Sequence, residues 1–219
     1  MSDPDLGRDW RAWHAEYDDP ASSLSRRLAV VRDELRGILA AAPGPLRLVS
    51  LCAGDGRDTL PVLAEERADV DAVLVELDPL LADRARSTAR ELDLDRVGVR
   101  TADAGSTDAF ADACPADVLL ACGVFGNVPD REVAATVAAL PSLLAAGASV
   151  VWTRGNRVPR DPTEVDGDPS EVVRGLFLAA GFEELSFVRP DDAGFRVGVH
   201  RWPGPTGSPR PGVRLFTFV

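Results

Sequence analysis

Lysine is absent from this sequence, and all 24 of its basic residues are arginines. The absence excludes chemistry that depends on a lysine amine: a P-loop, a pyridoxal Schiff base and a Tyr-x-x-x-Lys dehydrogenase pair. The net charge is -11. Because phosphate binding needs a basic face, this charge argues against a nucleic-acid partner.

Cysteine and histidine are also scarce, with three and two residues. Cys52, Cys114 and Cys122 are odd in number and have no CxxC spacing. We therefore expect neither a disulfide framework nor a metal site, and we expect a cytoplasmic protein.

Long apolar runs are lacking as well. The first ten residues are acidic and polar, unlike a signal peptide. The most apolar window, 133–152, is interrupted by a proline and a glycine, so we expect no membrane span.

The order of apolar segments predicts a single α/β domain over residues 1–219. A helical, lid-like segment (1–45) precedes a core (46–190) in which strand-like runs alternate with helical ones. Such alternation predicts a parallel sheet with helices on both faces. The core strands are expected at 46–51, 71–77, 97–103, 116–123 and 148–154, and a helix is expected at 107–113.

The end of the chain changes character. The runs 182–190, 195–202 and 213–218 are strand-like and have no helix between them. They predict an antiparallel addition at one edge of the sheet, and the sequence leaves open which of the last two runs inserts.

The turn after the first strand, SLCAGDGRD (residues 50–58), is the most informative stretch. Gly54 and Gly56 let the backbone bend and approach a ligand. Glu76 follows Gly56 by twenty residues and ends the second strand, where it can accept hydrogen bonds from ribose hydroxyls. These features fit a dinucleotide or S-adenosylmethionine.

Three details favour S-adenosylmethionine. Thr59 stands where the dinucleotide fingerprint has a small residue. Asp55 and Asp58 would repel a pyrophosphate but attract an ammonium or sulfonium group. Asp103 ends the third strand, where it can accept a hydrogen bond from the adenine amino group.

With these motifs the chain resembles the class I S-adenosylmethionine-dependent methyltransferases. LCAGDG, LVELDP and TADA match the family's first three cofactor motifs in order and spacing, and the similarity covers roughly residues 46–190. The resemblance implies a Rossmann-like fold: a seven-stranded, mostly parallel sheet of order 3-2-1-4-5-7-6, with helices on both faces and an antiparallel edge strand.

The resemblance also implies a cofactor site. Gly54 and Gly56 would line the methionine moiety, Glu76 would hold the ribose, and Asp103 with Ala104 would meet the adenine. The family often has an acidic residue and a glycine where Ser50 and Cys52 stand here, so contact with the ammonium group falls to backbone carbonyls or to Asp55. The expected cofactor-binding residues are Cys52, Ala53, Gly54, Asp55, Gly56, Glu76, Leu77, Asp103, Ala104 and Cys122.

The acceptor is expected beyond the ends of the fourth and fifth strands. The sequence CGVFGN replaces the Asn/Asp-Pro-Pro-aromatic motif of nucleic-acid amine methyltransferases. Asn127 either orients an acceptor or forms a turn, and Arg154 either clamps an anionic group or is a solvated strand-end arginine.

The aromatic N-terminal segment supplies the remaining candidates. His14 is the candidate catalytic base and Tyr17 a candidate substrate contact. Together with Trp10 and Trp13, Tyr17 forms either a lid or an apolar helix face that packs on the core.

The leading hypothesis is an S-adenosylmethionine-dependent methyltransferase that acts on a small molecule. The alternatives are a non-catalytic S-adenosylmethionine-binding regulator or subunit, and a nicotinamide-dependent oxidoreductase. An RNA or protein acceptor also stays open, and the sequence does not indicate an oligomeric state.

Overall fold

A single seven-stranded sheet organises the computed structural model, which describes residues 17, 19–66, 69–155 and 168–218. The strand order is β3-β2-β1-β4-β5-β7-β6, which confirms the order implied by the family resemblance. β7 runs antiparallel to both of its neighbours, and the other pairings are parallel. The strands are β1 (Leu46–Leu51), β2 (Val70–Glu76), β3 (Val97–Thr101), β4 (Ala116–Ala121), β5 (Leu144–Gly155), β6 (Glu183–Val188) and β7 (Phe195–Arg201).

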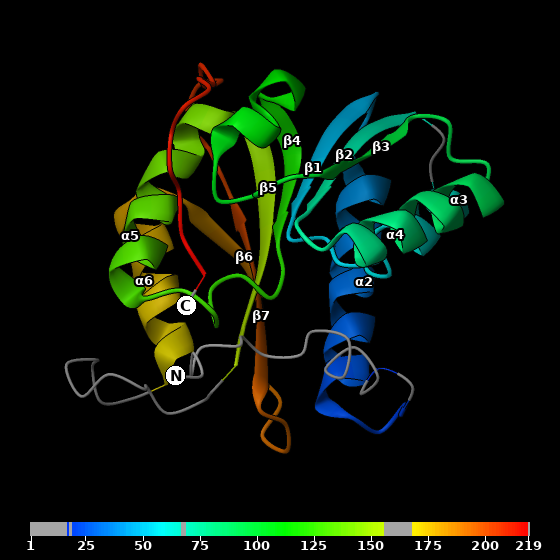
Figure 1. Cartoon of the computed structure of the whole chain (residues 1–219). Helices are drawn as coiled ribbons and strands as arrows, with labels where there is room; N and C mark the ends of the chain where they lie inside the picture. Colours follow the sequence, from blue (N-terminus) through cyan, green and yellow to red (C-terminus); the bar gives the residue numbers. More distant parts are fainter. Residues whose placement is uncertain (1–16, 18, 67–68, 156–167, 219) are drawn as a thin grey trace, which may run out of the picture.

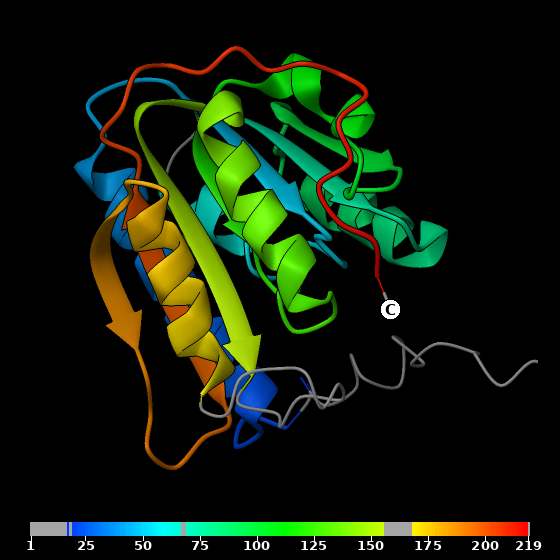
Figure 2. The same cartoon turned by 90° about the vertical axis from the view of Figure 1, so that its left-hand side faces the viewer.

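Helices cover both faces of this sheet, as Figures 1 and 2 show. One face packs against α2 (Ser23–Ala41), α3 (Leu60–Glu66) and α4 (Pro79–Glu91). The other packs against α5 (Asp130–Ala139), α6 (Pro169–Ala179) and three short 3-10 helices, η2 (Thr107–Ala109), η3 (Ala111–Ala113) and η4 (Leu140–Leu143). The two apolar cores are therefore separated by the sheet.

The central strand β1 illustrates why these apolar runs form strands. Val49 and Leu51 are buried in the core under α5, and Leu48 is buried in the core under α2. A strand covered on both faces needs apolar side chains on both, which gives a continuous run instead of alternation.

The structure decides the open question about the final segments. Residues Phe195–Arg201 insert as β7, between β5 and β6. The strand predicted at 213–218 is wrong: this run makes a single bridge, between Arg214 and Ser106, and crosses the loop after β3. The short helix predicted near residues 107–113 is present as two 3-10 helices, η2 and η3, which are interrupted at Phe110.

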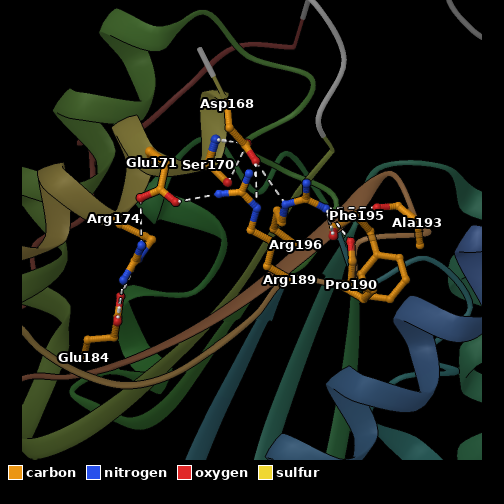
Figure 3. Close-up of polar contacts among 10 residues, drawn as sticks. All are labelled: Asp168, Ser170, Glu171, Arg174, Glu184, Arg189, Pro190, Ala193, Phe195 and Arg196. Carbon is orange, nitrogen blue, oxygen red and sulfur yellow. Dashed lines mark hydrogen bonds and ion pairs between the residues drawn. The ribbon is translucent and has the colours of Figure 1, made fainter.

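A charged network fastens α6 to the hairpin of β6 and β7 (Figure 3). Asp168 caps α6 by accepting a hydrogen bond from the Ser170 amide at 3.0 Å, and its other oxygen accepts one from Arg196 Nε at 3.0 Å. Arg196 is buried, and it also donates to the carbonyls of Ala193 and Phe195. A buried guanidinium with this many partners fixes the hairpin against the start of α6.

An aromatic cluster forms the core between β5, β7 and α6. Trp152 lies across Gly198, where a Cβ atom would approach its ring to 2.3 Å. The indole Nε1 donates to His200 Nδ1 at 3.0 Å, and the His200 ring stacks on Phe177 with centroids 4.5 Å apart. Burial lowers the pKa of His200 to about 4, although Glu184 at 3.6 Å opposes the shift. His200, one of the two histidines, is therefore a neutral core residue.

Within the ranges that the structure describes, no helix is both long enough and apolar enough to cross a bilayer.

The buried histidine should make stability depend on pH. The unfolded chain binds a proton near pH 6.5, but the folded protein binds it only near pH 4, so stability is full above pH 6.5 and falls as the pH drops. We expect the free energy of unfolding to decrease by about 2 kcal/mol between pH 7 and pH 5, measured by urea denaturation. The His200→Phe variant should lose most of this slope; an equal slope in both proteins would contradict the assignment.

Candidate functional site

A cavity of about 300 Å³ opens beyond the carboxyl ends of β1, β2, β3 and β4. Ligands in open parallel sheets bind at this edge, where the strand order reverses. All of the predicted cofactor residues except Gly56 line it, and so does Tyr17. The full lining is Tyr17, Arg27, Leu28, Val31, Cys52, Ala53, Gly54, Asp55, Arg57, Asp58, Glu76, Leu77, Asp78, Leu81, Asp103, Ala104, Cys122, Gly123 and Phe218.

Glu76 lines this cavity and links the turn after β1 to the start of α4. One carboxylate oxygen accepts a hydrogen bond from the Gly54 amide at 2.8 Å, and the other accepts one from the Asp78 amide, also at 2.8 Å. The residue is 9% exposed. Each oxygen keeps a lone pair for a further donor, so the contact with ribose hydroxyls stays a prediction that this geometry allows.

The two turn glycines differ in their roles. Gly54 and Gly56 both have positive φ, at 57° and 75°. Gly56 lies outside the lining as far as the described residues define it, and a Cβ atom there would come within 2.6 Å of Leu60. Gly56 therefore bends the turn and lets α3 approach the sheet.

The two aspartates of the turn are in different electrostatic states. Asp55 accepts a hydrogen bond from Arg57 Nε at 2.8 Å, an ion pair that the sequence analysis did not foresee. Asp58 accepts one from the Thr59 hydroxyl at 3.0 Å. Burial raises the pKa of Asp58, and the charge of Arg27 opposes this rise. Arg57 compensates Asp55, so Asp58 is the carboxylate better suited to attract a cation.

Asp103 is held by its own loop and by a distant segment. Its Oδ1 atom accepts a hydrogen bond from the Gly105 amide at 2.8 Å, and its Oδ2 atom pairs with Arg214. Asp103 and Ala104 both line the cavity, as expected of residues that would meet an adenine ring.

Helix α2 forms a wall that the sequence analysis missed. Arg27, Leu28 and Val31 face the cavity, and Arg27 Nη2 donates to the Tyr17 hydroxyl at 2.7 Å. The Arg57 guanidinium lies over the Tyr17 ring at 4.3 Å. Burial raises the pKa of Tyr17. Helical spacing marks the apolar stripe of α2, but the same spacing serves a core face or a cavity wall.

Cys52 and Cys122 both line the cavity, as their positions at the ends of β1 and β4 suggested. Burial raises the pKa of both thiols. Both side chains are therefore protonated at neutral pH and do not act as thiolate nucleophiles.

Asn127 and Arg154 are not part of the cavity lining found in the described ranges. The Asn127 amide donates to the Gly123 carbonyl at 2.6 Å, which closes the turn after β4. Arg154 is 8% exposed and pairs with Asp130 at 2.6 Å, so it is not a solvated arginine. His14 falls outside the residues that the structure describes, as do Trp10 and Trp13. Among the described residues, no group of three or more His, Cys, Asp or Glu is arranged to hold a metal ion.

No protein-family model matches this sequence, and no curated protein matches it. Solved structures do. Magnesium protoporphyrin IX methyltransferase (ChlM) from Synechocystis PCC 6803, with bound SAH, aligns with a TM-score of 0.66 at 14% identity, over 88% of this chain and 93% of that one. This chain has the class I methyltransferase fold.

Two further similar structures show whether this fold alone specifies a reaction. An O-methyltransferase family protein from Burkholderia thailandensis aligns with a TM-score of 0.65 at 18% identity, over 91% of this chain and 61% of that one. The [4+2]-cyclase SpnF aligns with a TM-score of 0.56, also at 18% identity, over 80% and 82% of the two chains. A fold shared by methyltransferases and a cyclase does not by itself specify methyl transfer.

The Glu76 geometry gives a direct test of the cavity. Glu76→Ala should weaken S-adenosylmethionine binding by about 1–3 kcal/mol, the scale of a charge-assisted hydrogen bond, as measured by isothermal titration. Glu76→Gln keeps one acceptor oxygen and serves as the control, with a smaller loss expected. Because Glu76 also holds the turn, both variants must first be verified as folded by circular dichroism. A folded Ala variant that binds as tightly as the wild type would remove Glu76 from the site.

Proposed function

We propose that this protein binds S-adenosylmethionine and transfers its methyl group to a small-molecule acceptor. The observation that carries the proposal is the composition of one cavity. Three segments singled out in the sequence, the turn at 52–55, the end of β2 and the loop after β3, contribute to its lining together with the apolar side of α2.

The residues of the cavity suit the parts of this cofactor. Glu76 and Asp103 offer carboxylate oxygens to hydroxyl and amino donors. Leu77 is 65% exposed and lines the cavity, so it offers apolar surface to a base. Asp58 lines the cavity and, when ionised, offers a negative charge to the cationic end. We assign the ammonium contact to Asp58 in place of Asp55, because Arg57 already pairs with Asp55.

When bound, S-adenosylmethionine supplies an electrophilic methyl group. Transfer is an in-line displacement, so the contribution of the chain is alignment of the two reactants and exclusion of water. Leu28 and Val31 on α2 give the cavity apolar surface that excludes water. Tyr17 and Arg27, which are hydrogen-bonded to each other, add polar groups to the same lining. The thiols of Cys52 and Cys122 stay protonated and add no competing nucleophile.

Fewer observations support the residues that we propose for binding the acceptor. We propose Tyr17 as a substrate contact because it lines the cavity, and His14 and Asn127 remain candidates from the sequence alone. Arg154 remains a candidate for an anionic group of the acceptor from the sequence alone, because in the described structure it pairs with Asp130 and lies outside the cavity lining. Three free thiols favour a reducing, cytoplasmic location, and the acidic net charge favours a small-molecule acceptor over a nucleic acid.

Cofactor choice separates the main hypotheses. We expect S-adenosylmethionine and S-adenosylhomocysteine to bind at least about tenfold more tightly than NADH, a difference of about 1.4 kcal/mol, in isothermal titration. Comparable or tighter NADH binding would favour the oxidoreductase. Binding of S-adenosylmethionine without S-adenosylhomocysteine release across a panel of small acceptors would favour the non-catalytic binder.

The assignment of Asp58 can be tested separately. Asp58→Asn should weaken S-adenosylmethionine binding by about tenfold and leave methylthioadenosine, which lacks the amino acid part, unchanged. The wild-type affinity should rise with pH while Asp58 ionises and then level off, because burial raises its pKa and a bound cation favours the ionised form. Asp55→Asn is the matched control. Equal losses in the two variants would contradict the assignment.

A further inference from the structure

Residues 210–218, which we call the strap, cross the loop that follows β3. The Leu215 amide donates to the Gly105 carbonyl at 2.7 Å, and the Leu215 carbonyl accepts a hydrogen bond from the Thr136 hydroxyl at 2.8 Å. The Thr217 amide donates to Glu132 at 2.6 Å. The strap is therefore hydrogen-bonded both to the loop after β3 and to α5.

Packing also holds the strap in place. Leu215 and Phe216 are 2% and 1% exposed and belong to the core under α5. A Cβ atom on Gly105 would lie 2.2 Å from the Phe216 carbonyl oxygen, so the close approach requires glycine there. Arg214 pairs with Asp103, which fixes the strap against the residue expected to meet the adenine.

This path brings Phe218 to the cavity. Phe218 lines it together with Leu77 and Ala104, and the Phe218 ring makes an edge contact with Phe216, with centroids 5.6 Å apart. Phe218 is 37% exposed, and Leu77 is 65% exposed. Two large apolar side chains thus present surface to the same cavity, where a flat apolar ligand would cover both.

We propose that Phe218 forms an aromatic wall for the purine ring of the cofactor, so that the strap completes the adenosine end of the site. The inference rests on the proposed function, and it adds a binding residue more than 110 positions away from the loop at Asp103. Aromatic rings bind bases by stacking, which does not need hydrogen-bond donors. Stacking does not distinguish one base from another, so the choice of adenosine follows from the proposed cofactor.

The test compares Phe218→Ala with Val213→Ala, which truncates an exposed strap residue that is not part of the lining in the described structure. Isothermal titration with S-adenosylhomocysteine and with methylthioadenosine measures each Kd. We expect Phe218→Ala to raise both Kd values about tenfold, because both ligands carry the adenosine part. Val213→Ala should change them less than about twofold, and melting curves should show all variants folded.

The possible results separate a failure of this inference from a failure of the proposed function. Wild-type protein that binds neither ligand overturns the proposed function and this inference with it. Wild-type protein that binds both, with unchanged Kd values in Phe218→Ala, overturns this inference alone. If Phe218→Ala does not fold, Phe218→Leu keeps the apolar bulk without the ring: a raised Kd supports the aromatic wall, and an unchanged Kd overturns it.

Discussion

The carboxylate of Glu76 is the contact on which the geometry of the cavity depends. It accepts the amide of Gly54 from the turn after β1 and the amide of Asp78 at the start of α4. A single buried side chain thus satisfies backbone donors from two crossovers. Together with the hydrogen bond from the Ala53 amide to the Val75 carbonyl at 3.0 Å, this carboxylate ties the turn to the end of β2.

The two aspartates of the turn do not contribute equally to its negative charge, because one of them forms an ion pair. The sequence places two aspartates there, and both seemed available to a cation. In the structure Arg57 neutralises Asp55, while Asp58 is half-buried and desolvation raises its pKa. The argument against a pyrophosphate ligand therefore rests mainly on Asp58.

Much of the fold was predictable because its signals are local. Apolar runs of strand length, which alternate with helical runs along the chain, indicated the parallel sheet. The glycines of the first turn and the twenty-residue interval to Glu76 lie within one crossover unit, and the roles of the cavity residues were implied by the family resemblance that these motifs carry. Arg27 and Phe218 were missed because their place in the cavity depends on how α2 and the strap pack, which spacing does not record. The run at 213–218 was predicted as a strand because Leu215 and Phe216 are apolar, but they pack on η2 and α5 without joining the sheet.

The strap affects when the cavity can form during folding. The cavity combines residues from the first βα unit, such as Gly54, with Phe218, which follows every strand that the structure describes. Contacts between such distant segments carry a large loop-closure cost and form late. During synthesis the seven described strands emerge before residue 218, so the cavity gains its Phe218 side only after the strands of the sheet are available.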